Sequence, residues 1–468
     1  MTEQAGELVE HPSDEMKRAH LSARRSWLIV AGAVLAGVAL YHCLPFDEAP
    51  RKGLALLLVV AILWLTEAIH VTITALLVPA GALLLGFPGF DTKRTLASFA
   101  DPIIFLFFGG FALATALHVQ KLDRKIAYWL MSLSGAHLGV SSVLLFVVTA
   151  VLSMWISNTA VAAMMLPLAL GVLSTLDSRQ ERNTFIFVLL GVAYAASIGG
   201  LGTLVGTPPN AIAAQALNID FAAWMMFGLP LVLILLPLMI VALWLVLRPQ
   251  LDRRVELVHE AIPWTTARVL TMAVFVASAM AWFSGDYIGQ ALGIASQDTF
   301  IALVAVALIS ILRLVTWRQI AENTDWGVLL LFGGGLTLSD LLRSSGAASV
   351  LGDQVAVLLG GMPPLLVIFG STLFIVMLTE FTSNTASAAL LVPVFAAIAR
   401  QMGMPEAVLV LMIGIGSSCA FMLPVATPPN AIMFGTGYIH LRDMMKAGAV
   451  LNSFCIVVLT LWGYCALL

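Results

Sequence analysis

Long apolar stretches, separated by short polar clusters, run along most of the chain and predict its elements. Eleven of them reach roughly the 20 residues that an α-helix needs to cross a bilayer. Because backbone groups inside a membrane must be hydrogen-bonded within the protein, continuous runs of this length predict helices. The predicted crossings are residues 27–44, 53–69, 71–88, 101–119, 184–217, 223–247, 265–284, 299–316, 326–342, 405–437 and 447–466.

Two further apolar segments, residues 139–176 and 362–400, each hold the triplet Ser-Asn-Thr near the middle. The apolar runs on either side of the triplet are too short to be comfortable as separate crossings. We therefore predict that both segments are re-entrant hairpins with the triplet at the tip. The expected fold class is an all-α polytopic membrane protein with eleven transmembrane helices and two re-entrant hairpins.

The order of motifs repeats along the chain. "ADPIIFLFFGGFAL" at 100–113 matches "TDWGVLLLFGGGLTL" at 324–338, the Ser-Asn-Thr triplet recurs, and "GTPPNAIA" at 206–213 returns as "ATPPNAIM" at 426–433. Each unit holds five predicted crossings and one hairpin, and an odd number of crossings inverts the second unit, as in secondary transporters. The predicted parts are a polar cytoplasmic N-terminal tail (1–26), a first transmembrane helix and loop (27–52), a first inverted repeat (53–260, broken helix at 206–210) and a second (261–468, broken helix at 426–430).

Composition supports the membrane interpretation. Of 468 residues, 60% are hydrophobic and 10% are charged, with a mean hydropathy of +0.99, whereas soluble domains carry about 25% charged residues. The net charge of -3 is too small to indicate a nucleic-acid partner. The first 25 residues lack the apolar core of a secretory signal peptide. The cysteines show no metal or disulfide spacing and are expected to be free thiols: Cys43, Cys419, Cys455 and Cys465.

Lys and Arg concentrate in cytoplasmic loops, so their distribution predicts the orientation. With the N-terminus in the cytoplasm, the external segments carry six of the 23 Lys and Arg residues, Arg51, Lys52, Lys93, Arg94, Arg343 and Arg400, and the inner segments carry the rest. If either hairpin were a true crossing, every later loop would lie on the opposite side of the membrane, and the excess of Lys and Arg on the cytoplasmic side would be lost. We expect a multi-pass protein with an external C-terminus.

The repeated polar motifs indicate binding chemistry. Each Thr-Pro-Pro-Asn motif removes backbone donors and should break its helix, and a broken helix at mid-membrane is tolerated where it is buried in protein or lines a wet cavity. Carbonyl and hydroxyl oxygens suit a hard cation such as sodium, while amide donors and helix N-termini suit an anion. Polar residues in membrane helices can also simply hold helices together, but the duplication favours one central site.

Other polar positions leave their roles open. Glu67 in "WLTEAIH" and Glu380 in "LTEFTSNT" are intramembrane acids and thus functional candidates, or they pair with a buried cation or cap a helix end. The glycines of "LFFGGF" and "LFGGGL" are expected at close helix packing or bending positions, since no strand-turn-helix context makes them phosphate loops. The histidines avoid the repeated motifs, which gives little support to a metal site.

Together, the paired Ser-Asn-Thr and Thr-Pro-Pro-Asn motifs, "WLTEAIHVTITALLVP" and "CAFMLPVATPPNAIMFGTG" resemble the divalent anion/sodium symporter family. The likeness is to its INDY-type bacterial sodium-coupled C4-dicarboxylate transporters, and it covers nearly the whole chain from about residue 50. The resemblance implies a homodimer in the bacterial inner membrane, surrounded by lipid. It also implies a scaffold domain and a transport domain that moves the substrate by an elevator mechanism.

The resemblance also assigns residues. It implies a first sodium site at Ser153, Ser157, Asn158 and Gly206, and a second at Thr379, Ser383, Asn384 and Ala426. The substrate carboxylates are expected at Asn158, Thr159, Thr207, Asn384, Thr385, Thr427 and Pro428. Thr207 stands where relatives often have serine, so the hydroxyl is kept. No Lys, Arg or His replaces a motif residue, which favours sodium coupling over sodium-independent exchange.

The expected function is sodium-coupled uptake of succinate, malate or fumarate, with sodium as the co-transported ion and no enzymatic activity. Burying a dianion costs several kcal/mol per charge, and the motifs offer no cationic side chain to offset that cost, so bound cations must do so. Citrate or sulfate transport and sodium-independent exchange remain alternatives within the family. An anion channel would need a continuous pore, and an intramembrane serine hydrolase would need a base beside Ser157 or Ser383.

Overall fold

The computed structural model describes residues 12–135, 137–254, 262–294, 296–359 and 361–468. These residues are helical apart from connecting loops and one isolated β-bridge between His137 and Arg254. The helices are α1 (Pro12–Cys43), α2 (Glu48–Thr66), α3 (Val71–Leu85), α4 (Thr92–Ala97), η1 (Ser98–Ala100), α5 (Pro102–Val119), α6 (Leu122–Ser132), α7 (Leu138–Ser153), α8 (Asn158–Leu173), α9 (Arg182–Gly200), α10 (Pro208–Leu217), α11 (Phe221–Leu247), α12 (Thr266–Phe283), α13 (Gly285–Leu292), α14 (Gln297–Ile311), α15 (Trp317–Asn323), α16 (Trp326–Ser344), α17 (Ala347–Leu359), α18 (Pro364–Thr379), α19 (Asn384–Gln401), α20 (Glu406–Gly416), α21 (Pro428–Phe434) and α22 (Leu441–Leu467).

Eight helical segments in the described part of the chain are long and apolar enough to cross a membrane. They are Arg25–Cys43, Glu48–Thr66, Thr92–Val119, Arg182–Gly200, Phe221–Leu247, Thr266–Phe283, Trp326–Ser344 and Leu441–Leu467. The expectation of an all-α multi-pass membrane protein is therefore confirmed. Six further apolar helices, including α3, α14 and α20, are shorter.

Helices are interrupted at all four polar motifs. The two segments predicted as hairpins are the helix pairs α7–α8 and α18–α19, and each pair is joined by a short non-helical tip that ends at the serine of Ser-Asn-Thr. The predicted crossing at 184–217 consists of α9 and α10, and the one at 405–437 consists of α20 and α21. Proline begins α10 and α21 because its fixed φ suits the first helical position.

The helix bounds differ from the sequence prediction at several places. Helix α1 begins at Pro12, inside the predicted tail, while residues 1–11 of that tail lie outside the described residues. Several short helices, including α6 and α17, fall between the predicted crossings and hairpins, in segments predicted as loops. Local capping supports two of them, since Asp91 caps α4 and Thr316 and Gln319 form a capping box at α15.

The core is built around two buried helices. All residues of α9 from Thr184 to Gly200 are buried, and α9 packs against α7, α8, α11 and α21. Helix α20 is buried from Val408 to Gly416 and packs against α18, α19 and α22. Both of these helices end at a break. Residues 201–207 of the first break are buried, whereas Val425 in the second break is 83% exposed.

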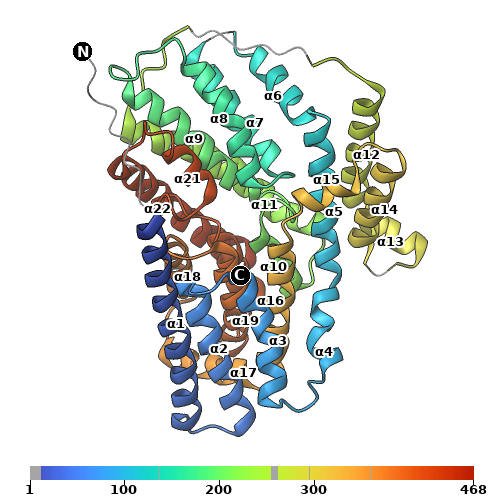
Figure 1. Cartoon of the computed structure of the whole chain (residues 1–468), viewed down its shortest axis with the longest axis vertical. Helices are drawn as coiled ribbons and strands as arrows, with labels where there is room; N and C mark the ends of the chain where they lie inside the picture. Colours follow the sequence, from blue (N-terminus) through green and yellow to red (C-terminus); the bar gives the residue numbers. More distant parts are fainter. Residues whose placement is uncertain (1–11, 136, 255–261, 295, 360) are drawn as a thin grey trace.

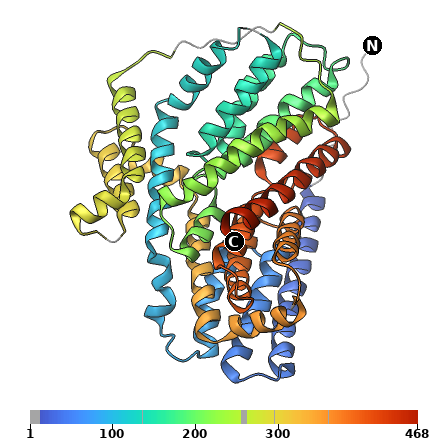
Figure 2. The same ribbon diagram turned by 180° about the vertical axis from the view of Figure 1, so that it is seen from behind.

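Elements from the two halves of the chain pack on each other. Helix α3 lies against α16, and α5 lies against α14. Along the long axis of the molecule, α6, α7 and α8 lie toward one end and α17 toward the other, while α12 to α14 form an outer flank in both views (Figure 1 and Figure 2). The matching elements of the two halves, α6 and α17, are therefore at opposite ends.

The glycine-rich segments are at close helix contacts, as expected. A Cβ on Gly334 of α16 would lie 2.5 Å from the carbonyl oxygen of Ala75 on α3, and one on Gly109 of α5 would lie 2.6 Å from the Cβ of Ala302 on α14. Backbone approach of this kind requires a residue without a side chain. These glycines bring the two halves of the chain together.

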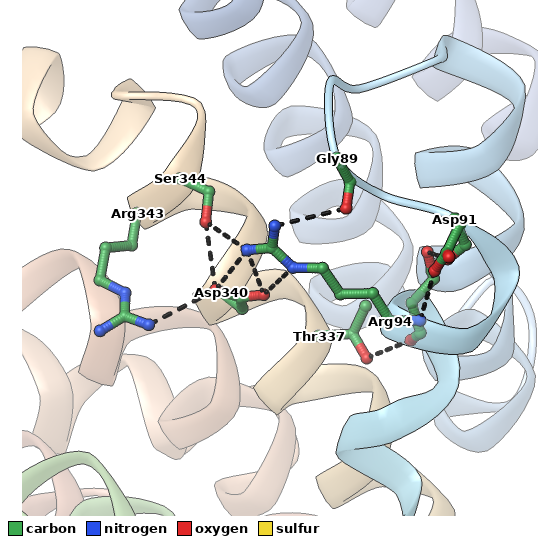
Figure 3. A network of polar contacts seen from close by, with 8 residues as sticks. Gly89, Asp91, Arg94, Thr337, Asp340, Arg343 and Ser344 are labelled. Atoms are coloured by element: carbon green, nitrogen blue, oxygen red, sulfur yellow. Dashed lines mark hydrogen bonds and ion pairs between the residues drawn. The ribbon is translucent and has the colours of Figure 1, made fainter.

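A polar network also joins the halves, at the loop between α3 and α4 (Figure 3). Arg94 of α4 donates from Nε and Nη2 to Asp340 of α16 at 3.2–3.4 Å, and Nη2 also donates to Ser344 Oγ at 3.1 Å. Its Nη1 donates to Gly89 O at 3.3 Å, and the guanidinium lies 4.3 Å from the ring centre of Phe90. Forked contacts of this type fix orientation as well as position.

Candidate functional site

A cavity of about 630 Å³ lies where the two tips and the two helix breaks converge. This volume is within the ordinary range for a site that encloses a small molecule. It is lined by Ser157, Asn158, Thr159, Gly206, Thr207 and Pro208 of the first half and by Ser383, Asn384, Thr385, Ala426, Thr427 and Pro428 of the second. The repeated motifs, far apart in sequence, therefore meet in one place.

The first tip is shaped by its own polar side chains. Ser157 is the N-cap of α8, and its Oγ accepts a hydrogen bond from the backbone N–H of Ala160 at 3.4 Å. Ser153, at the end of α7, donates from Oγ to Asn158 Oδ1 at 2.5 Å. Because Ser153 is fully buried, this bond fixes the Asn158 amide from behind the cavity.

The second tip has the same arrangement. Ser383 caps α19 by accepting from the N–H of Ala386 at 3.4 Å, and Thr379 donates from Oγ1 to Asn384 Oδ1 at 2.7 Å. Thr379 Oγ1 also lies 2.6 Å from the carbonyl oxygen of Ser417, which ties this tip to the loop after α20. Two equivalent oxygen-rich tips thus face one cavity.

Each helix break is closed by the asparagine of its Thr-Pro-Pro-Asn motif. Asn210 Nδ2 donates to the carbonyl oxygens of Gly200 at 2.8 Å and Thr203 at 2.7 Å. Asn430 Nδ2 donates in the same way to Ala420 at 3.1 Å and Leu423 at 3.0 Å. A carboxamide therefore satisfies two free carbonyl groups that the end of a helix would otherwise leave unpaired.

The structure gives Glu380 a definite place. Its side chain is 1% exposed, and its carboxylate accepts hydrogen bonds from the consecutive amides of residues 421–423 at 2.7–3.1 Å and from Asn452 Nδ2 at 2.7 Å. Glu380 therefore holds the loop before α21 against the second tip. Glu67 is the other intramembrane acid whose role the sequence left open. It lines the cavity, and its backbone is left-handed with φ of 47°.

The charges at the cavity wall come from acidic side chains, and a histidine is also present. Among the described residues that line it there is no Lys or Arg, whereas Glu67, Asp123 and Asp325 are present. His118 is also at the wall, with Nδ1 2.8 Å from Asp123 Oδ2. In the part of the chain described, no group of three His, Cys, Asp or Glu side chains could hold a metal. A bound anion would therefore depend on amide and hydroxyl donors, helix N-termini and cations in the oxygen-rich tips.

Nearly all of the residues predicted from the sequence meet at the cavity. The seven predicted substrate residues line it, as do Ser157, Gly206, Ser383 and Ala426 of the predicted sodium sites. Ser153 and Thr379 lie behind the two tips, fully buried. The structure thus brings predicted residues from both halves of the chain together around one cavity.

Sequence reasoning missed two contacts that hold the breaks in place, one at each break. The fully buried Tyr194 of α9 donates from its hydroxyl to the carbonyl oxygen of Phe421 at 2.7 Å. Trp224 of α11 donates from Nε1 to Leu201 O at 3.0 Å in the first break. Neither residue belongs to a repeated motif, so only the fold could reveal them.

Comparison with known proteins gives a consistent result. Residues 23–468 match the family described as the sodium:sulfate symporter transmembrane region. An uncharacterised transporter of Haemophilus influenzae is 52% identical over 95% of this chain and 98% of its own length. The sodium-dependent dicarboxylate transporter SdcS of Staphylococcus saprophyticus is 32% identical over 89% of this chain and 87% of its own length.

Two solved structures share the fold at low sequence identity. The Alcanivorax borkumensis YdaH transporter aligns over 83% of this chain and 96% of its own with a TM-score of 0.57 and 13% identity. Neisseria gonorrhoeae MtrF aligns over 92% and 98% with a TM-score of 0.58 and 13% identity. With the family match over nearly the full length, these results mean that the chain is a membrane transporter, not an enzyme, and belongs to the sodium:sulfate symporter family, the divalent anion/sodium symporters.

Proposed function

We propose that this protein is a sodium-coupled symporter that imports C4-dicarboxylates such as succinate, malate and fumarate. The observation that carries the proposal is a cavity with polar, oxygen-rich tips on both sides and no Lys or Arg among its described lining residues. Placing a dianion in such a site costs several kcal/mol per charge. Cations bound at the tips offset that cost, and this requirement couples the two fluxes.

The proposed cation sites follow the two tips. Ser153, Ser157, Asn158 and Gly206 form the first, and Thr379, Ser383, Asn384 and Ala426 form the second. In each, a buried hydroxyl positions the asparagine of the triplet. The substrate carboxylates then lie between the tips, against Asn158, Thr159 and Thr207 and against Asn384, Thr385, Thr427 and Pro428. The name of the staphylococcal relative supports dicarboxylate as the substrate class.

The proposed mechanism is alternating access by an elevator motion in a homodimer. It is supported by the repeated motifs and by the position of α6 and α17 at opposite ends of the molecule (Figure 1). In this proposal the chain has eleven crossings and two re-entrant hairpins, α7–α8 and α18–α19, in two inverted repeats. The N-terminus faces the cytoplasm and the C-terminus is external in the bacterial inner membrane.

Uptake of radiolabelled succinate into proteoliposomes tests the function. We expect accumulation with an inward sodium gradient and little uptake when potassium replaces sodium. Each net positive charge carried inward adds about 2.3 kcal/mol per 100 mV of membrane potential. If more than two sodium ions accompany each succinate dianion, an inside-negative potential should therefore increase succinate uptake. Equal uptake in potassium medium would contradict sodium coupling. If excess citrate or sulfate inhibits succinate uptake more strongly than malate or fumarate does, citrate or sulfate would be the preferred substrate instead of a C4-dicarboxylate.

A further inference from the structure

The side-chain oxygens of Asn210 and Asn430 have no hydrogen-bond partner although both residues are fully buried. The orientation of each carboxamide is set by its neighbours, because Nδ2 faces two carbonyl oxygens and a flipped amide would place Oδ1 against them. A buried acceptor without a partner lowers the stability of a folded protein. The same unpaired oxygen at matching positions of both repeats indicates a binding role.

In the first half, this carboxamide is beside the proposed cation site. Asn210 Nδ2 binds the carbonyl oxygen of Gly200, and Oδ1 is attached to the same carbon as Nδ2. A Cβ built on Gly200 would lie 2.7 Å from Asn158 Oδ1, 3.0 Å from Asn158 Nδ2 and 3.2 Å from Gly206 O. All three atoms belong to residues of the proposed first site. The position that a Gly200 side chain would take is therefore in direct contact with polar atoms of that site.

The second half differs at one atom. Gly200 precedes the first motif by the same number of residues as Ala420 precedes the second, and both carbonyl oxygens accept from the motif asparagine. The backbone at the two positions therefore has the same role. Ala420, however, carries a methyl group where Gly200 carries none, so the surroundings of the two proposed cation sites are unequal.

We propose that Asn210 and Asn430 each supply a further oxygen to the bound sodium ions, and that Gly200 leaves the room that the first sodium ion requires. This inference rests on the proposed function, since it names further residues of the same cation sites. It predicts that a single methyl group added at residue 200 blocks the first site and leaves the second intact.

The test is thermal unfolding of purified full-length protein in detergent, without substrate, with sodium chloride titrated against choline chloride. We compare wild type with Gly200→Ala and with Gly370→Ala, a control on α18 where an added Cβ meets nothing within 4 Å. Sodium should raise the Tm of wild type and of the control. Gly200→Ala should lose at least half of the sodium-induced rise, measured from its own Tm in choline chloride, which the close contact of the new Cβ with Asn158 lowers.

A packing role for Gly200 gives a different result, because it lowers the Tm of Gly200→Ala equally with and without sodium. That result, or a full sodium response in the variant, would overturn the proposal for Gly200. If wild type itself shows no sodium response, the proposed sodium sites fail instead.

Asn210 is tested separately by Asn210→Ala, with Trp224→Phe as the control, and both are read as the sodium concentration that gives half of the Tm rise. Asn210→Ala should increase this concentration about tenfold, whereas Trp224→Phe, which removes another donor to the same break and no oxygen, should leave it near the wild-type value. Equal increases in the two variants, or a wild-type response in Asn210→Ala, would reduce Asn210 to a brace for the loop.

Discussion

At the scale of single residues, the site is made of small polar groups fixed by other small polar groups. Asn158 and Asn384 are each positioned by a buried hydroxyl from the preceding helix, Ser153 in one half and Thr379 in the other. A carboxamide held in this way loses little further freedom when a ligand binds, which favours affinity. The triplet motif therefore combines a helix cap with a carboxamide that is held in place at the cavity wall.

The first prediction concerns the two amides. Asn158→Ala and Asn384→Ala should each reduce sodium-driven succinate uptake by at least a hundredfold, because each removes a group that the proposed function assigns to both a cation site and the substrate site. Protein yield and elution volume should be unchanged. Asn323→Ala, at the cavity wall, is the control and should keep most of the activity. Near-normal uptake by either tip variant would make that tip a structural contact only.

The second prediction concerns Glu380. Glu380→Ala would leave three consecutive backbone amides and the Asn452 amide without their acceptor. Unpaired buried donors cost about 1–3 kcal/mol each before relaxation, so the Tm in detergent should fall by several degrees. Glu322→Ala removes an exposed ion pair with Arg318 on α15 and should leave the Tm unchanged. A wild-type Tm for Glu380→Ala would contradict the bracing role.

At the scale of elements, sequence patterns predicted the long apolar helices and the position of each interruption. Proline pairs and Ser-Asn-Thr triplets break helices for local reasons, so their effect can be seen in the sequence. The start of α1 and the short helices α6 and α17 were missed, since helices of about three turns depend on packing more than on their own periodicity. Glu380 could be singled out as an intramembrane acid, but its partners 41–72 residues away could not.

The third prediction tests helix packing. Gly334→Ala should destabilise the protein, because the new Cβ would lie 2.5–2.7 Å from backbone atoms of Ala75 and the α3–α16 contact would have to open. We expect a cost of about 1–3 kcal/mol, measured as a lower Tm. Gly370→Ala on α18 is the matched control and should retain the wild-type Tm. Equal Tm values for the two variants would mean that α16 can shift without cost.

At the scale of the whole molecule, the two tips are unequally accessible. Ser157, Thr159 and Ala160 of the first tip are exposed, whereas the matching residues of the second tip are half-buried or, at Ala386, 2% exposed. Two tips with equivalent local bonds thus have different surroundings. An inverted repeat allows the surroundings to be exchanged while local contacts persist.

The fourth prediction follows from this inequality. In a variant without the exposed Cys43 and Cys465, and with Cys419 and Cys455 also replaced, a cysteine introduced by Ala160→Cys should react with a membrane-impermeant maleimide from the cytoplasmic side. Ala386→Cys should react more slowly and from the external side. Saturating sodium and succinate should change both rates, because ligands redistribute the conformations that they bind unequally. Labelling of both from one face under every ligand condition would contradict the inverted topology.

The hydrogen bond from Tyr194 to Phe421 has a consequence for the order in which the protein is made. The chain is synthesised from its N-terminus, so α9 is in the membrane long before residue 421 leaves the ribosome. Until then, the Tyr194 hydroxyl lacks the acceptor that it has in the finished protein, and a polar group of this kind is costly to leave in an apolar interior. The first half of the chain can insert early, but it reaches its final packing only when the second half arrives. Biosynthesis thus makes the two repeats dependent on each other, although each carries a full set of motifs.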